Sequence, residues 1–121
     1  MVKKIKKTNQ ILITLIQDLK KTASQNDAPI WKDIAKRLEK PSRNWPIVNL
    51  YRIDKHIREN ETALIPGKVL SPGNLTKKVS VAAWSFSAKS IEKIKKAGGK
   101  TLYINDLIKK NPKGKDIRIL G

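Results

Sequence analysis

The side chains that usually carry enzyme chemistry are scarce in this sequence and lie far apart along it. The chain of 121 residues has no cysteine and one histidine, His56, and its ten aspartates and glutamates are scattered and mostly flanked by lysine or arginine. Catalysis needs acids, bases and nucleophiles that converge on one site. Asp33 and Arg37 have the spacing of a helical ion pair, not that of two cooperating carboxylates. We therefore expect no enzyme, and no metal or cofactor site.

The chemistry that this chain does offer is positive charge. Lysine and arginine number 27 against ten acidic residues, which gives a formal net charge of +17. Self-repulsion of this size destabilises a compact fold unless an anionic partner neutralises it. The basic residues run through the whole chain, which favours nucleic acid over a small acidic ligand or a membrane surface. The absence of cysteine also excludes disulfides and thiolate zinc sites, so a cytoplasmic location is the default expectation.

A strand that passes into a helix is the clearest structural pattern. Residues 79–84 alternate in the manner of a strand, and Ser87 can then cap a helix by accepting a bond from a free backbone N–H. Ile91 and Ile94 follow at helical spacing, and Gly98-Gly99 supplies the left-handed residue that commonly ends a helix. The polar side of this helix is a cationic stripe of Lys89, Lys93, Lys96 and the following Lys100. Two interpretations stay open for the stripe, a solvated face or a surface that meets phosphates.

The N-terminal third has the pattern of a helical hairpin behind a basic arm, residues 1–7. Apolar residues on one face predict an amphipathic helix from about Thr8 to Lys21 or Ser24. Pro29 suits the first turn of a second helix, which ends near Lys40-Pro41. The apolar run in the first helix is too short for a signal peptide or a membrane span.

The remaining chain alternates between short strands and short helices. Prolines stiffen the loop 40–46, which lowers the entropy lost if the loop docks on a partner. We expect Arg43 and Asn44 to contact that partner and Trp45 to plug the core. A strand should run into a helix within residues 47–57, and the segment Thr62–Ile65 should be a strand that Pro66-Gly67 closes. Further elements are predicted in order: a turn at residues 70–74, a strand at 100–103, a helix that Asn105 caps and that runs to Lys110, and a last strand at 117–119.

These elements predict a mixed α/β fold, with an N-terminal helical hairpin followed by a small unit of irregular strand-strand-helix turns. No glycine-rich loop lies between a strand and a helix, so a nucleotide-binding doubly wound sheet is not expected.

Several segments, taken in order, resemble the archaeal and eukaryotic large-subunit ribosomal protein family called L-eighteen-e, which is related to bacterial ribosomal protein L-fifteen. Each segment alone is weak evidence, but all of them in the right order over nearly the whole length are specific. The segments are Trp31-Lys-Asp-Ile-Ala-Lys-Arg-Leu38, Pro41-Ser-Arg-Asn44, Val48-Asn-Leu-Tyr-Arg-Ile53, Ile65-Pro-Gly-Lys-Val-Leu70, Val79-Ser-Val-Ala-Ala83, Phe86-Ser-Ala-Lys89, Ala97-Gly-Gly99 and Asn111-Pro-Lys-Gly-Lys-Asp-Ile-Arg-Ile-Leu120.

This resemblance implies a structural protein of the large ribosomal subunit that binds folded ribosomal RNA (rRNA), beside neighbouring ribosomal proteins in the cytoplasm. It implies no membrane and no small-molecule substrate. We expect a basic arm at 1–7 and a single ribosomal-protein domain at 8–121, with a helical part at 8–46 and a strand-strand-helix part at 47–121. The arm and the proline loop are expected to be embedded in rRNA.

Lysine and arginine side chains that neutralise phosphates release counterions, and folded rRNA is recognised largely by shape and backbone. We therefore predict that rRNA contacts come from the arm, the proline loop, the short helix after it, the Pro-Gly-Lys turn and the C-terminal segment. The predicted contacts are Lys3, Lys4, Lys6, Lys7, Arg43, Asn44, Arg52, Lys68, Lys113, Lys115 and Arg118. The alternative is a free-standing basic nucleic-acid-binding protein, such as a chromatin protein or an RNA chaperone. No helix-turn-helix, zinc-finger or RNA-recognition pattern supports that alternative.

Overall fold

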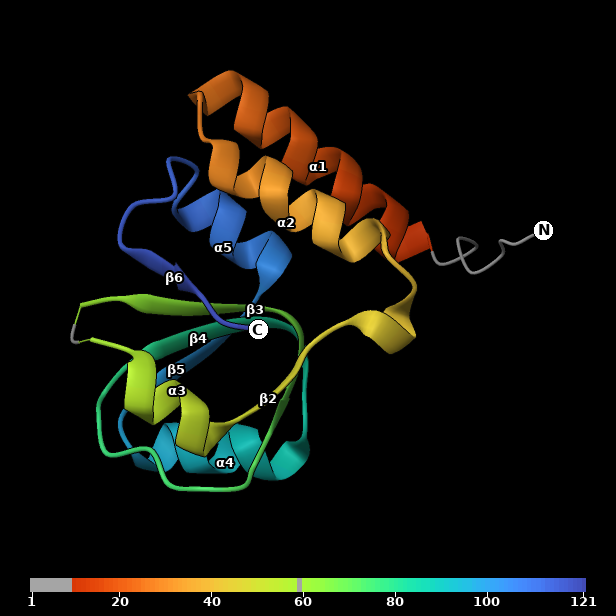
Figure 1. The fold of residues 1–121 in the computed structure, drawn as a ribbon. Helices are drawn as coiled ribbons and strands as arrows, with labels where there is room; N and C mark the ends of the chain where they lie inside the picture. The colour runs from red at the N-terminus through yellow and green to blue at the C-terminus, as the bar shows by residue number, and fades with distance from the viewer. Residues whose placement is uncertain (1–9, 59) are drawn as a thin grey trace.

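A central sheet of parallel strands carries helices on both of its faces in the computed structural model (Figure 1), which describes residues 10–58 and 60–121. The helices are α1 (Gln10–Asn26), α2 (Pro29–Glu39), α3 (Leu50–His56), α4 (Ala88–Lys96) and α5 (Ile104–Lys110), with a 3-10 turn η2 (Ser42–Asn44). The strands are β2 (Ile47–Asn49), β3 (Thr62–Leu70), β4 (Ser80–Phe86), β5 (Lys100–Tyr103) and β6 (Ile117–Ile119). This architecture confirms the predicted mixed α/β fold.

The order of the strands gives the sheet two distinct ends. The sheet runs β2-β3-β4-β5, and every pair is parallel. Strand β6 also pairs with β3, beside residues 62–64, whereas β2 lies beside residues 68–70. Because all strands point the same way, their carboxyl ends gather at one edge and their amino ends at the other. In Figure 1, β3 and β4 run from the left of the sheet to its right, the side on which η2 lies.

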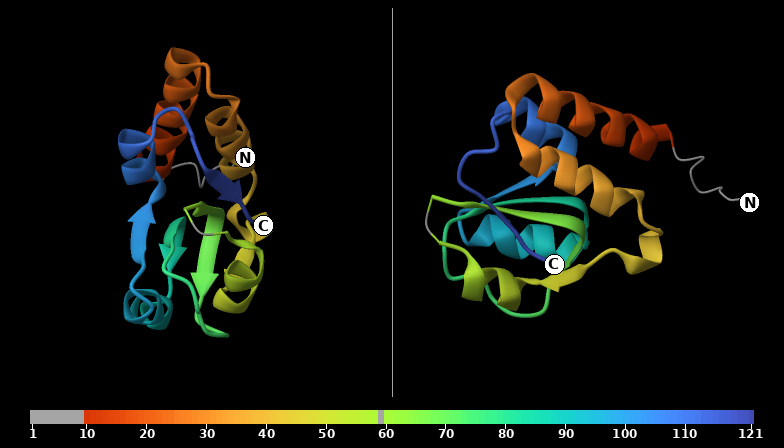
Figure 2. Two further views of the ribbon diagram at one scale, coloured as in Figure 1. Left: turned by 90° about the vertical axis from the view of Figure 1, so that its left-hand side faces the viewer. Right: turned by 45° about the horizontal axis from the view of Figure 1, so that its top comes forward.

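The core consists of two layers, one on each face of the sheet. Strand residues alternate between the faces, so Leu64 and Ala82 pack with α1, α2 and α5, while Ile65 and Val81 pack with α3 and α4. Figure 2 shows the two groups of helices on opposite sides of the sheet. The largest buried side chain, Trp31, lies in the first layer and donates its indole N–H to the carbonyl of Pro112 at 2.7 Å. This bond ties the helical hairpin to the C-terminal segment.

The strand-to-helix pattern and the helical hairpin are both confirmed. Ser87 caps α4, since its side-chain oxygen accepts a bond from the backbone N–H of Ser90 at 3.2 Å. Gly98 has a φ of +82°, the left-handed conformation expected after that helix. Helix α2 begins at Pro29 as predicted, and the short strand that runs into α3 near Tyr51 is also present.

Two local predictions were wrong. Pro66-Gly67 does not close a strand, because β3 continues to Leu70 through an irregularity in register between Ile65 and Lys68. Glycine is needed there since a Cβ on Gly67 would overlap the carbonyl oxygen of Pro46. Asn105 does not cap α5; the helix begins one residue earlier, and Tyr103 holds the capping position without a side-chain bond.

Candidate nucleic-acid interface

The proline loop presents Arg43 and Asn44 on a rigid turn at the carboxyl end of the sheet. Both residues are exposed in η2. Two backbone hydrogen bonds close the turn. The N–H of Asn44 donates to the carbonyl of Pro41 at 2.8 Å, and the N–H of Trp45 donates to the carbonyl of Ser42 at 3.0 Å. The indole N–H of Trp45 donates to the carbonyl of Lys40 at 3.1 Å. The two side chains are therefore displayed on a loop that loses little entropy when it docks.

Lys68 lies beside this turn, although 25 residues separate it from Arg43 in the sequence. Its backbone N–H donates to the carbonyl of Pro46 at 3.1 Å, and it pairs in register with Ile47. Its side chain is exposed, as is that of Arg43. Among the described residues, neither side chain makes a hydrogen bond or an ion pair with the protein. The structure thus brings together three of the predicted contact residues at one end of the sheet.

Four aromatic side chains lie at the same end. Trp45 of the loop meets Trp84 of β4 edge to face, with ring centroids 5.6 Å apart at 74°. Phe86 meets Tyr103 of β5 in the same manner, at 5.9 Å and 76°. Trp45 is half-buried against the layer formed by α1, α2 and α5, so it plugs the core as expected. The exposed cations therefore lie at the same end of the sheet as two edge-to-face aromatic pairs.

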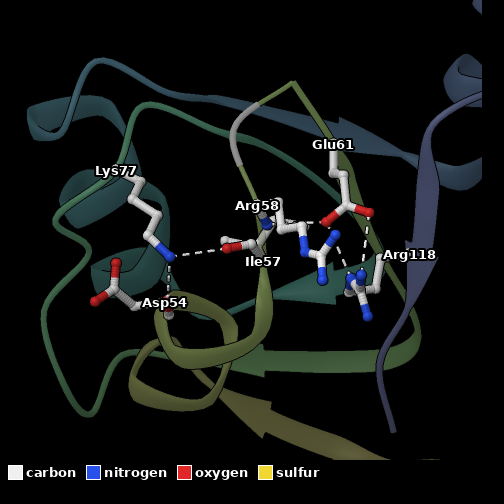
Figure 3. A network of polar contacts seen from close by, with 6 residues as sticks. All are labelled: Asp54, Ile57, Arg58, Glu61, Lys77 and Arg118. Atoms are coloured by element: carbon white, nitrogen blue, oxygen red, sulfur yellow. Dashed lines mark hydrogen bonds and ion pairs between the residues drawn. The ribbon is translucent and has the colours of Figure 1, made fainter.

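Arg118, at the amino end of the sheet, is engaged inside the protein (Figure 3). The Nε of Arg118 lies 3.0 Å from Oε1 of Glu61, and its Nη2 lies 3.3 Å from Oε2. The hydrogen bond from Arg118 and one from the backbone N–H of Arg58 lower the pKa of Glu61, and the same carboxylate raises the pKa of Arg118. A phosphate near Arg118 would thus meet an ion pair and not a free cation. The predicted contact of Arg118 with rRNA stays a prediction.

Two further lysines hold the long loop between β3 and β4. The ammonium group of Lys77 donates to the carbonyls of Asp54 and Ile57, at 3.0 and 2.8 Å, and so satisfies the C-terminal end of α3. The carboxylate of Asp54 in turn accepts bonds from the backbone N–H and the hydroxyl of Thr76. Lys93 donates to the carbonyls of Ser71 and Gly73, at 3.0 and 2.9 Å. The stripe on α4 is therefore not uniform: Lys93 is half-buried and structural, whereas Lys89, Lys96 and Lys100 are exposed.

The remaining predicted contacts lie apart from the carboxyl-end group. Arg52 is exposed on α3. Lys113 and Lys115 are exposed in the turn after α5, where the side chain of Asn111 bonds the backbone of Lys115 twice, at 2.7 and 3.2 Å. That turn lies across the molecule from η2 (Figure 1). Lys3, Lys4, Lys6 and Lys7 lie outside the described residues.

The described residues contain no group of three or more side chains that could hold a metal ion. His56 is exposed at the end of α3. The predicted helical ion pair is present, with Nε of Arg37 3.3 Å from Oδ1 of Asp33. Within the part of the chain that the structure describes, no helix has the length and apolar character needed to cross a membrane.

Sequence reasoning missed the structural lysines and the two aromatic pairs. Lys77 and Lys93 look like ordinary solvated charges in the sequence, because their acceptors lie 20 to 23 residues away along the chain. Ile11 is one of the apolar residues whose spacing predicts the first helix and its buried face, yet its side chain is 74% exposed. Its place directly before the buried Leu12 was the available signal, since adjacent residues cannot both lie at the centre of one helical stripe.

Comparisons with known proteins identify one family. The family model described as "Ribosomal protein 60S L18 and 50S L18e" matches residues 1–121. The large ribosomal subunit protein eL18 of Methanothermobacter thermautotrophicus is 50% identical over 120 residues, which cover 99% of both chains. The proteins of the same name from Methanococcus maripaludis and Archaeoglobus fulgidus are 47% and 46% identical, over 99% and 96% of this chain and 100% and 99% of their own lengths.

Proposed function

This chain belongs to the ribosomal protein 60S L18 and 50S L18e family, and on that premise we propose that it is a structural constituent of the large ribosomal subunit. In that role it binds folded large-subunit rRNA and stabilises it, in the cytoplasm and beside neighbouring ribosomal proteins. Its family is one of structural components, so it is not an enzyme. The likeness to eL18 proteins over nearly their full length is the observation that carries this proposal.

The charge distribution supports binding to RNA. A net charge of +17 needs a polyanion, and exposed cations without protein partners among the described residues lie at both ends of the sheet. Arg43, Asn44 and Lys68 would contact the RNA backbone at the carboxyl end, and Lys113 and Lys115 at the amino end. Arg52 on α3 would add a contact between the two ends. The four lysines of the arm, Lys3, Lys4, Lys6 and Lys7, complete the proposed set.

The rigidity of the loops supports recognition by shape. An rRNA fold is recognised mainly through its backbone, which requires cations at fixed positions more than a deep pocket. The turn η2 and the turn closed by Asn111 both hold their cations by backbone bonds. We further propose that residues 8–121 fold as a single domain and that 1–7 form a basic arm. The shared core of the hairpin with Leu64 and Ala82 supports a single domain over dividing the chain at residue 46.

Sedimentation of a cell lysate through sucrose gradients at two salt concentrations, followed by blotting for this chain, tests the proposal. We expect the chain in the large-subunit peak at low and at moderate salt. Ribonuclease treatment before the gradient should move it to the top, because its binding depends on RNA. A chain that stays at the top in every gradient, or that follows DNA, would overturn the proposal in favour of a free-standing nucleic-acid-binding protein.

A further inference from the structure

An open groove of about 600 Å³ lies at the carboxyl end of the sheet, between the first turns of α1 and the ends of β4 and β5. Ile11 and Tyr103 line it, and their side chains are 74% and 51% exposed. Trp84 forms part of its floor. Large apolar side chains left open to this extent beside one groove are characteristic of binding surfaces.

The polar part of the lining disfavours a phosphate as the occupant. Among the described residues no lysine or arginine lines the groove, and Asp18, an exposed carboxylate, does. That carboxylate would repel a phosphate. Gln10, Thr14 and Asn105 add neutral donors and acceptors to the lining. An apolar wall with a mixed polar rim suits a flat heterocycle with hydrogen-bonding edges.

The aromatic geometry leaves one ring available for stacking. Phe86 meets Tyr103 edge to face, so the contact between the two rings does not cover both faces of Tyr103. Half of the Tyr103 side chain is exposed. The chain's other tyrosine, Tyr51, is 60% exposed on α3, but the ammonium group of Lys55 lies 6.0 Å from the centre of its ring. Tyr103 is therefore the better platform for an incoming ring.

The surroundings favour RNA over a protein as the source of that ring. Arg43 and Lys68 stand at the same end of the sheet as the groove, and Trp84 of the groove packs against Trp45, two residues from Arg43. A nucleotide with its base in the groove would thus have cations near its backbone.

We propose that this groove receives one unpaired nucleobase of the large-subunit rRNA, stacked on Tyr103 between Ile11 and Trp84. This inference rests on the proposed function and adds a base-reading contact to the backbone contacts already described. Single-stranded bases in RNA are commonly recognised by stacking on aromatic side chains and by hydrogen bonds to their edges. The carboxylate of Asp18 accepts hydrogen bonds only, so the base would turn an N–H donor toward it, from an exocyclic amino group or from the ring.

Binding of purified variants to protein-free large-subunit rRNA, measured by filter binding at one fixed salt concentration, tests the stacking. Tyr103→Ala should weaken binding roughly tenfold, the effect of losing one aromatic platform. Tyr103→Leu keeps apolar bulk against Phe86 and should lose as much, whereas Tyr103→Phe should stay within about twofold of the original chain. Tyr51→Ala is the matched control and should also stay within about twofold.

Cross-linking by ultraviolet light in purified large subunits supplies the second readout. We expect a nucleotide attached to a peptide that contains Tyr103 or Trp84. Cross-links confined to other segments, with Tyr103→Ala binding rRNA at full strength, would overturn the inference and leave the proposed function standing. Full-strength binding together with a protein cross-link at the groove would assign it to a protein neighbour and also overturn the inference. If the original chain binds no rRNA and is absent from large subunits, the proposed function itself fails.

Discussion

Two pairs of cations at opposite ends of the parallel sheet use their positive charge in opposite ways. At the carboxyl end, Arg43 and Lys68 extend from rigid backbone without protein partners among the described residues, beside aromatic rings and an open groove. At the amino end, Lys77 caps a helix and Arg118 pairs with Glu61 (Figure 3). Arg43 and Lys68 are thus available to an external anion, whereas Lys77 and Arg118 already have acceptors within the protein; Lys113 and Lys115, which lie near the amino end, resemble the first pair and not the second.

This difference shows that the number of cations does not by itself locate an interface. A lysine that donates to two backbone carbonyls stabilises the fold, and its removal affects the free energy of unfolding. A lysine whose ammonium group has no acceptor in the protein adds nothing comparable to the fold, and its removal affects RNA affinity and the salt dependence of binding. Measuring both quantities for the same variant separates the two classes.

Removal of the two exposed cations at the carboxyl end should weaken RNA binding more than any other change considered. The double variant Arg43→Ala/Lys68→Ala should bind protein-free large-subunit rRNA roughly fifty- to a hundredfold more weakly at about 0.1 M salt, because two phosphate contacts are lost. The slope of log affinity against log salt should become shallower by about two. Titrations at four or more salt concentrations measure both values, and the unfolding midpoint should not change.

The control for that variant is Lys95→Ala/Lys96→Ala, which removes the same charge from exposed positions on α4. We expect an affinity loss of no more than about threefold from it, since general attraction is screened beyond a Debye length. Equal losses from the two double variants would mean that net charge, not position, governs binding. The proposed distinction between the two ends would then fail for RNA.

The next largest effect concerns stability at the amino end. Lys77→Ala should lower the free energy of unfolding by about 1–2 kcal/mol, because two carbonyls at the end of α3 lose a charged donor while the site stays partly open to water. Urea titration followed by circular dichroism measures this. Lys78→Ala, at the exposed neighbour, should stay within about 0.5 kcal/mol. A loss of the same size from both variants would show that the bonds of Lys77 contribute nothing specific.

A sharper comparison pairs two residues that the sequence predicted to contact RNA. Lys115→Ala should make the salt slope shallower by about one and leave the unfolding midpoint unchanged, because its side chain is exposed and has no acceptor among the described residues. Arg118→Ala should leave the salt slope unchanged and lower the unfolding midpoint, since it breaks the ion pair with Glu61. Salt titrations and thermal unfolding of both variants decide this. A slope that falls by one in Arg118→Ala would place a phosphate at Arg118, as the sequence predicted.

Local patterns in the sequence predicted most of the elements. The change of period at Ser87, the proline at the start of α2 and the left-handed glycine after α4 each act within one turn of chain, so they are readable without tertiary contacts. The parallel order of the strands was not readable, because β6 pairs with β3 across about 55 residues. The continuation of β3 past Pro66 likewise depends on a contact of Gly67 with Pro46, a distant part of the chain.

The candidate site was predictable in composition but not in arrangement. The stiff loop with Arg43 and Asn44 was visible from its prolines, whereas its junction with Lys68 needs the register of β2 on β3. The groove needs the start of α1 to meet the ends of β4 and β5, a contact between segments at least 65 residues apart. Separating structural lysines from free ones required the same long-range information.

The smallest expected effect is a dependence of stability on pH that belongs to the amino end. The pKa of Glu61 is lowered in the folded protein, mainly by the hydrogen bond from Arg118 and then by that from the N–H of Arg58. In the unfolded chain the same carboxyl titrates near the usual value of about 4.3. The unfolded state therefore takes up this proton at a higher pH than the folded state. The stabilisation from Glu61 is present above about pH 4.3 and is lost as the pH falls through the lower, folded pKa.

Thermal unfolding from pH 6 to pH 3 should thus show the original chain losing more stability than Glu61→Gln, whose side chain does not titrate. Arg118→Gln should remove most of this difference, since it removes the main cause of the shift. Parallel curves for the original chain and Glu61→Gln would show that the amino-end pair does not favour the ionised carboxylate, and that Arg118 is as free for an external anion as Arg43.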